Sequence, residues 1–357
     1  MSLTSYDPNL AQKAASEPAQ LVPLEKIESC LSTLLSTPQG IEKLFTSQHR
    51  AFQNSTLESK QKGLSSSLPI QTAGQIPQPT LTAGKGAQVC IKTGYVKDGE
   101  MMVSKVAAGG GDDTGNTGVV FVFSQKTLRL QTVLCDEGLL TEVRTAAACA
   151  FASKLLLGKK VKDVTKIGIV GGGVQAVWQL RMLKSLNQNC RTVVVKTRSR
   201  QSAQAFMDRM KSSTYLPDRE WEFEHYESVP DGGKGFRECQ LIHTLTTSRE
   251  PVLSSEDCNV GSEMDFLHIT TVGADSPGKC ELSHELIRKA NSLYCDSKPQ
   301  SMERGEFQAQ EFHDKLVEIG SIEISPHEEA GGRFTIFDSS GLPLQDVEMA
   351  NLISNML

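Results

Sequence analysis

A glycine-rich segment at residues 166–176, KIGIVGGGVQA, constrains the fold of this chain more than any other stretch. An apolar run before the glycines predicts a β-strand, and the apolar spacing after them predicts a helix. Three small residues in the segment follow the pattern G-x-G-x-x-A. In a strand–turn–helix unit, these residues permit a tight turn, close approach of a pyrophosphate and close packing of helix on strand. The segment therefore predicts a Rossmann-like unit whose helix N-terminus faces a dinucleotide. Its predicted cofactor-binding residues are Gly171, Gly173, Val174, Gln175 and Ala176.

The loop after the next predicted strand indicates which dinucleotide is bound. The strand at residues 193–195 leads into KTRSR at residues 196–200, which contains no acidic residue. Proteins that prefer NAD usually place Asp or Glu here, whereas a nearby arginine accommodates the 2′-phosphate of NADP. Arg198 can form two bonds to a phosphate, and Thr197 and Ser199 can donate hydrogen bonds to the same oxygens. The loop thus predicts NADP(H). The alternative is a solvated basic loop after a buried strand.

Charge and composition exclude several classes of partner. The net charge is −5, and no basic stripe interrupts the sequence, which argues against nucleic acid and an anionic membrane surface. No apolar run is long enough to span a membrane, and residues 1–30 lack the layout of a signal peptide. Nine scattered cysteines, never spaced C-x-x-C, predict neither a metal site nor a disulfide framework. We therefore expect a cytoplasmic protein.

Strand and helix patterns predict an α/β protein with two domains. From residue 146 to residue 310, apolar strands alternate with helices, as expected of a Rossmann-like domain with a parallel sheet. Residues 1–145 are expected to form an N-terminal α+β domain, in which residues 1–20 are a loose leader. Residues 311–357 are predicted to return to this first domain.

Several segments in combination resemble the ornithine cyclodeaminase/μ-crystallin family. The resemblance covers roughly residues 88–350 and implies a discontinuous α+β substrate domain that also forms the interface of a homodimer. It places the active site between this domain and the Rossmann-like domain. Family members include cyclodeaminases, ketimine reductases and alanine dehydrogenases. The segments that carry the resemblance are LLTEVRTAAACAFASKLL, GIVGGGVQA, TTVGADSPGKCEL, KPQSMERGEF and FTIFDSSGLPLQD.

The resemblance implies roles for three residues. Lys92 in IKTGYV corresponds to the catalytic lysine, Arg144 in TEVRTAA to the arginine that binds the substrate carboxylate, and Asp275 in GADSPGK to the catalytic aspartate. The chemistry agrees, because a guanidinium can hold a carboxylate by two parallel bonds and a lysine adds a second cation beside it. Asp275 follows an apolar strand, so we expect it at the carboxyl end of the sheet. There it can exchange the amine proton, provided that burial raises its pKa.

Each of these residues has a simpler interpretation. Arg144 would then cap or ion-pair on the face of an alanine-rich helix that begins with Thr141 as N-cap. Lys92 would extend to solvent, and Asp275 would form only an Asx-turn. The histidines at positions 243 and 268 lie inside apolar strands and are interpreted as hydrogen-bonded sheet residues.

The chain departs from the family pattern in the segments around the lysine. Members usually carry an arginine in a P-x-R setting before it and a G-L-P-T run after it, whereas this chain reads LPIQTAG and MMVSKVAAGG. Gln71 therefore stands where the arginine is expected, and Lys105 stands where the threonine would be. Lys105 is predicted to restore the carboxylate clamp as a substrate-binding cation. The alternative is a substrate that differs from those of the common members.

The resemblance and the basic loop together imply an NADPH-dependent oxidoreductase of amino-acid metabolism. The expected reaction is reduction of the C=N bond of a small imino acid, of the cyclic ketimine carboxylate type. Alternatives within the enzymes are an ornithine-cyclodeaminase-like enzyme and an amino-acid dehydrogenase. The alternative from another class is a μ-crystallin-like protein that binds NADP and a small ligand without catalysis.

Overall fold

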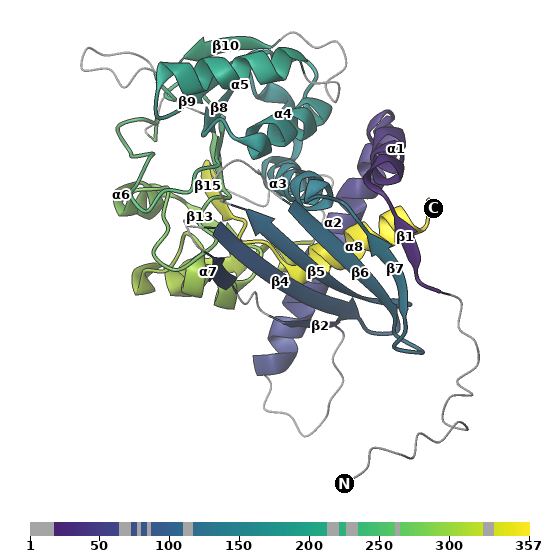
Figure 1. The fold of residues 1–357 in the computed structure, drawn as a ribbon. Coiled ribbons are helices and arrows are strands. Elements are labelled where there is room, and N and C mark those ends of the chain that lie inside the picture. The colour runs from purple at the N-terminus through teal and green to yellow at the C-terminus, as the bar shows by residue number, and fades with distance from the viewer. Residues whose placement is uncertain are drawn as a thin grey trace, which may run out of the picture.

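The computed structural model describes residues 18–63, 73–76, 80–83, 87–109, 117–212, 221–225, 235–260, 265–323 and 332–357. Gln71 and most of the leader predicted at residues 1–20 lie outside these ranges. The described residues form two β-sheets with helices packed against both (Figure 1). No helix among them has the length and apolar character needed to cross a membrane.

The first sheet is mainly antiparallel. Its strand order is β1-β7-β6-β5-β4-β2, with β3 also paired to β4, and only the β1–β7 pair is parallel. Side chains alternate between its two faces, as strand geometry requires. The strands are β1 (Gln20–Val22), β2 (Ala73–Ile76), β3 (Thr80–Ala83), β4 (Ala87–Val96), β5 (Met101–Gly109), β6 (Thr117–Ser124) and β7 (Leu130–Leu134).

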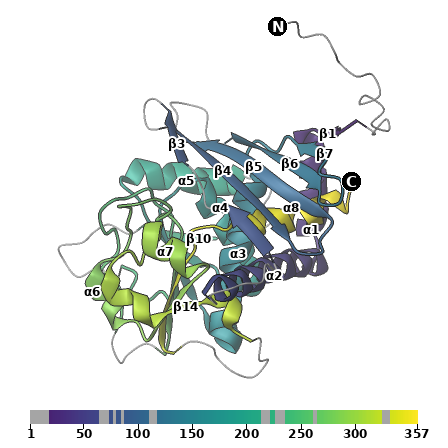
Figure 2. The ribbon, with the colours of Figure 1, turned by 90° about the horizontal axis from the view of Figure 1, so that it is seen from below.

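Four helices lie on one face of this sheet. They are α1 (Leu24–Leu35), α2 (Pro38–Gly63), α3 (Leu139–Leu157) and α8 (Pro343–Ser354). Figure 2 shows α8 directly beneath the strands, where it contacts β4 and β5 on one side and α2 and α3 on the other. The opposite face, turned toward the viewer in Figure 1, carries half-exposed apolar side chains. These include Ile91, Val106, Val119, Phe121 and Phe123.

Helix α3 joins the two sheets, since it contacts α2 and α8 in one domain and α4 and β12 in the other. Its alanines are fully buried, because small side chains let neighbouring elements approach closely. The predicted N-cap is wrong: α3 begins after Gly138, whose φ is 87°, and the carboxylate of Asp136 accepts the N–H of Leu140 at 3.0 Å. Gly158 ends the helix with a φ of 53°.

The second sheet is parallel throughout and has the order β10-β9-β8-β11-β12-β15-β13-β14. The chain moves from β8 outward to β10 and then returns to β11 on the other side of β8, which is the switch point of a doubly wound fold. The strands are β8 (Lys166–Val170), β9 (Thr192–Lys196), β10 (Glu222–His225), β11 (Leu241–Thr244), β12 (Leu267–Thr271), β13 (Ser292–Cys295), β14 (Leu316–Glu318) and β15 (Phe334–Asp338). The helices α4 (Val174–Leu186), α5 (Arg200–Ser212), α6 (His284–Lys289) and α7 (Lys298–Arg304) accompany them, with short 3-10 turns at Gly158–Asp163, Gln310–Lys315 and Ile319–Ser321. The predicted fold class, a Rossmann-like domain plus an α+β domain, is confirmed.

The C-terminal segment is divided between the two sheets. Strands β14 and β15 belong to the parallel sheet, whereas the 3-10 turn at Ile319–Ser321 contacts α2 and α8 packs on the antiparallel sheet. The sequence interpretation assigned the whole of residues 311–357 to the first domain. All five residues of β15 are buried, which is typical of an interior strand of a parallel sheet and explains its position between β12 and β13.

Candidate functional site

The glycine-rich turn between β8 and α4 has the geometry that a dinucleotide requires. Gly171 adopts a φ of 104°, and a Cβ there would lie 2.7 Å from the carbonyl oxygen of Leu245, so only glycine fits. A Cβ on Gly173 would meet nothing within 4 Å, which leaves the N-terminus of α4 open to a phosphate. Ala176 is fully buried where the helix packs on the sheet. These residues, with Val174 and Gln175 in the first turn, fit a bound pyrophosphate.

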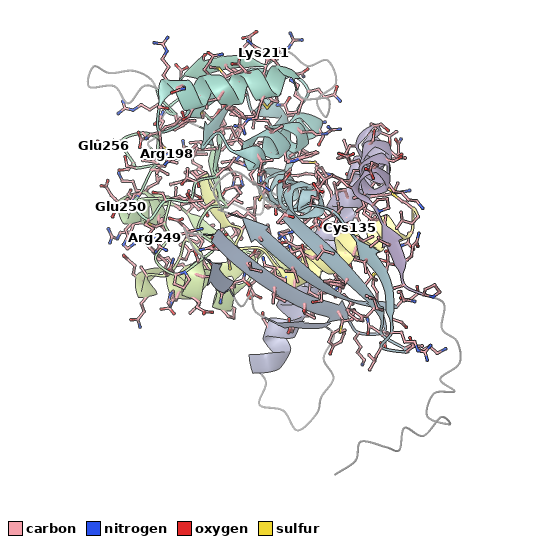
Figure 3. The ribbon with its side chains drawn as sticks, viewed as in Figure 1. Cys135, Arg198, Lys211, Arg249, Glu250 and Glu256 are labelled. Carbon is pink, nitrogen blue, oxygen red and sulfur yellow. The ribbon has the colours of Figure 1, made fainter. Side chains whose placement is uncertain are left out.

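The predicted phosphate loop after β9 directs Arg198 to solvent. The Thr197 hydroxyl donates to the carbonyl of Ser199 at 2.7 Å, and the Ser199 hydroxyl accepts the N–H of Ser202 at 3.1 Å in the first turn of α5. Arg198 is exposed at the surface (Figure 3). Arg209, which the sequence reasoning missed, donates from α5 to the carbonyl of Gly172. Among the three predicted ligands, Arg198 is thus the side chain most available to a 2′-phosphate.

Three basic side chains gather between the antiparallel sheet and its helices. Lys92 on β4 and Lys105 on β5 are directly opposite each other in the strand register and face α8. Arg144 reaches the same place from α3. Their exposed fractions are only 7%, 2% and 3%, respectively. The structure therefore brings together all three residues that were predicted to bind the substrate carboxylate.

Helix α8 supplies the partners of these cations, which the sequence reasoning missed. One oxygen of Asp346, Oδ1, accepts from Lys105 Nζ at 2.8 Å and from Arg144 Nε at 3.0 Å. Gln345 Oε1 accepts from Arg144 Nη1 at 2.8 Å. Burial opposes ionisation of Asp346, but the neighbouring cations hold the pKa of this carboxyl below its usual range. The sequence signal that could have revealed these partners is the presence of polar residues in a terminal helix that is buried.

Lys92 contacts the loop before α8 instead of a carboxylate. Its Nζ donates to the carbonyl of Gly341 at 3.1 Å. Gly341 has a φ of 84°, and a Cβ there would lie 2.9 Å from Lys92 Nζ and 3.3 Å from Arg144 Nη1, so the backbone approaches both cations closely. The N–H of Gly341 is held by Asp296 Oδ2 at 2.6 Å. Burial, Arg144 and Lys105 together lower the pKa of Lys92 to about 7.

Asp275 lies in the loop that follows β12, at the carboxyl end of the parallel sheet, as expected. Its side chain is 45% exposed and forms an ion pair with Lys279 Nζ at 2.6 Å, so the burial expected for this carboxyl is not found. The negative charge of Asp275 attracts the charge of Lys92 and so partly opposes the lowering of the pKa of Lys92. The aspartate and the cation cluster therefore share one electrostatic environment.

Two buried glutamates hold the loops at this edge of the sheet. Glu281 accepts the backbone N–H groups of Thr246 at 2.6 Å and Gly273 at 2.8 Å, which ties the ends of β11 and β12 together. Glu306 in turn accepts the N–H of Leu282 at 2.7 Å. Burial raises the pKa of both glutamates. They fix the backbone of the loop that carries Asp275.

The histidines inside the strands are hydrogen-bonded sheet residues, as predicted. His243 Nδ1 pairs with Gln179 Oε1 at 3.0 Å, and His268 Nδ1 pairs with the hydroxyl of Thr335 at 2.8 Å. Both rings are fully buried, and burial lowers the pKa of each to about 3. In the part of the chain that the structure describes, no three His, Cys, Asp or Glu side chains are grouped so as to hold a metal ion.

Comparison with known proteins agrees with this architecture. The chain is 30% identical to alanine dehydrogenase of Archaeoglobus fulgidus over 222 residues, which cover 60% of this chain and 62% of that protein. It is 28% identical to the ketimine reductase mu-crystallin of Mus musculus over 218 residues, covering 61% and 63% of the two chains. Both alignments therefore span less than two thirds of the relative.

A solved structure extends the likeness over nearly the whole chain. Δ1-pyrroline-2-carboxylate reductase of Thermococcus litoralis, in complex with NADH and L-proline, superimposes with a TM-score of 0.72 at 22% sequence identity. The match covers 94% of this chain and 96% of that one. The family model of the ornithine cyclodeaminase/mu-crystallin family matches residues 116–357. The chain belongs to the ornithine cyclodeaminase/mu-crystallin family.

Proposed function

We propose that this protein is an NADPH-dependent oxidoreductase that reduces the C=N bond of a small imino acid, such as a cyclic ketimine carboxylate. The observation that carries this proposal is the buried cluster of three cations, Lys92, Lys105 and Arg144, which can bind the carboxylate of an acid substrate. Asp275, at the carboxyl end of the parallel sheet, acts electrostatically on the same cluster. Relatives named as ketimine reductase and pyrroline-carboxylate reductase support the reaction type.

The chain's own side chains divide the work of this reaction. A bound nicotinamide supplies the hydride that adds to the imine carbon. Arg144 and Lys105 hold the substrate carboxylate and fix the carbon that reacts, and Lys92 is the third cation beside them. Asp275 provides the proton that the imine nitrogen gains, and its negative charge stabilises the cationic iminium before transfer. Lys92, whose pKa lies near 7, is the second group able to exchange a proton near neutral pH.

A substrate panel tests the reaction. NADPH oxidation is measured with Δ1-piperideine-2-carboxylate and Δ1-pyrroline-2-carboxylate, and NADP⁺ reduction with L-alanine. Consumption of NADPH with a ketimine supports the proposal. Activity only with L-alanine favours the amino-acid dehydrogenase, which the 30% identical relative suggests. Conversion of L-ornithine without net change of cofactor indicates a cyclodeaminase. Tight binding of NADPH without turnover of any compound indicates a ligand-binding protein.

Cofactor preference is expected to depend on Arg198. The Arg198→Ala variant should lose about 1.5–3 kcal/mol of NADPH binding, the range for a hydrogen bond to a charged group, while NADH binding changes little. Fluorescence titration of both cofactors measures the difference. Lys211→Ala, an exposed change at the far end of α5, is the control (Figure 3). Equal affinities of the wild type for NADPH and NADH would contradict the proposed preference.

We also propose a homodimer built on the antiparallel sheet. Apolar side chains on the face opposite the helices remain half-exposed, and pairing across a two-fold axis would cover them. Multi-angle light scattering at micromolar concentration is expected to give about twice the 38.9 kDa mass of one chain. A single-chain mass under those conditions would rule the dimer out.

A further inference from the structure

Cations outnumber the carboxylates that bond to them in the candidate site. Lys92, Lys105 and Arg144 are all buried, and Asp346 is the one described carboxylate that contacts members of the cluster. Its Oδ1 serves Lys105 and Arg144 together, and it makes no bond to Lys92. Of three buried positive charges, one is therefore compensated by a directly bonded carboxylate.

The other carboxylates near Lys92 are bonded to different groups. Asp296 accepts from the N–H of Gly341 and from the hydroxyl of Ser340. Asp275 is paired with Lys279 outside the cluster. The bond that Lys92 makes within the described residues goes to an uncharged carbonyl oxygen. Among the residues that the structure describes, Lys92 thus has no contacting anion.

A buried ammonium without a bonded anion is costly, which is why burial lowers the pKa of Lys92 in the free protein, and a bound anion would favour its charged form. One substrate carboxylate would offset one of the two remaining positive charges and leave the other buried. We propose that Lys92 binds a second acid group, so that the substrate is an imino acid with two carboxylates: one held by Arg144 and Lys105, the other by Lys92. This assignment rests on the proposed C=N reductase function and names the substrate class of the same site.

Matched pairs of 2-oxo acids with excess ammonium, which form imines in solution, test the proposal. Oxaloacetate is compared with 2-oxobutyrate, and 2-oxoglutarate with 2-oxopentanoate, each with NADPH. The readout is the ratio of kcat/KM for the dicarboxylate to kcat/KM for the monocarboxylate of equal length. We expect this ratio to exceed 10 in the wild type and to fall about 10- to 100-fold in Lys92→Met, since a bond between charged groups is lost.

Because the ratio is taken within one variant, it is insensitive to a loss of folded protein. Lys92→Arg should preserve the preference, because it keeps the positive charge. Lys97→Met, at an exposed position just after β4, should leave the ratio unchanged. A wild-type ratio near one, or an equal effect of Lys92→Met on both members of a pair, would overturn the assignment and leave the reductase function standing.

Binding without turnover separates this proposal from the proposed reaction. With NADP⁺ present, calorimetry compares L-aspartate with L-2-aminobutyrate, and L-glutamate with L-norvaline. At least tenfold tighter binding of one dicarboxylic amino acid is expected, and Lys92→Met should abolish that difference. If no oxo acid or ketimine is reduced but this preference holds, the reaction is wrong and the second carboxylate site stands. The absence of any preference in binding overturns the site.

The pH dependence gives a further test. Lys105 and Arg144 repel the charge of Lys92, whereas Asp346 and Asp275 attract it, and the pKa of Lys92 in the free protein is about 7. The dicarboxylate preference should therefore decline as pH rises through about 7, because the ammonium loses its proton. Lys92→Arg, whose guanidinium stays charged, should keep the preference across pH 6–9. A parallel decline in that variant would contradict the role of Lys92.

Discussion

Replacing Asp275 by asparagine is expected to lower turnover about 10²- to 10⁴-fold, the usual worth of general acid–base help. Asparagine keeps the size of the side chain and most of its hydrogen bonding, but it cannot exchange a proton or stabilise an iminium by charge. Cofactor binding should survive, because the glycine-rich turn lies in a different loop. Steady-state kinetics with a ketimine and a separate NADPH titration measure the two properties.

Asp265→Asn is a suitable control, since Asp265 is exposed at the amino end of the same strand region and should tolerate the change. If Asp275→Asn reduces a ketimine at a near wild-type rate, Asp275 is only a loop residue that pairs with Lys279. The reductase function would then stand, and another group, such as Lys92, would have to provide the proton. Lost NADPH binding in this variant would instead point to a displaced loop.

The cofactor-binding turn could be predicted from sequence because its requirements are local. Gly171 needs a positive φ and Gly173 needs open space, and both follow from a strand–turn–helix unit only a dozen residues long. The structure agrees with that geometry. The burial expected for Asp275 is not found, because the exposure of its side chain is not set locally. It depends on the ion pair with Lys279 and on how the loop folds, and the preceding strand determines neither.

The interior of the cation cluster could not be predicted, because it depends on pairings between distant segments. Lys92 and Lys105 meet through the register of β4 and β5, and a shift of one residue would turn one of them to the other face. Asp346 bonds to Arg144 across 202 positions of sequence. The C-terminal segment was similarly misassigned, since nothing within FTIFD indicates which sheet the strand joins.

The Asp346→Asn variant should be strongly destabilised, by about 3–5 kcal/mol, the usual cost of removing one partner of a buried ion pair. Asparagine fills the same volume, but it leaves Lys105 and Arg144 buried without a bonded negative charge. Urea unfolding at pH 7, followed by far-UV circular dichroism, measures the difference in unfolding free energy. Asp314→Asn, an exposed change, should stay within about 0.5 kcal/mol of the wild type.

The pH dependence of this difference identifies its electrostatic origin. Cations lower the pKa of Asp346 in the folded protein, so its stabilisation is fully present above the unfolded value of about 3.9 and is lost as pH falls through the lower folded value. The difference in unfolding free energy between wild type and Asp346→Asn should therefore persist near neutral pH and become smaller only below about pH 4. If the difference in unfolding free energy between wild type and Asp346→Asn is the same from pH 3 to pH 9, Asp346 acts by packing and not by charge. The count of buried cations that assigns Lys92 to a second carboxylate would then have to be revised.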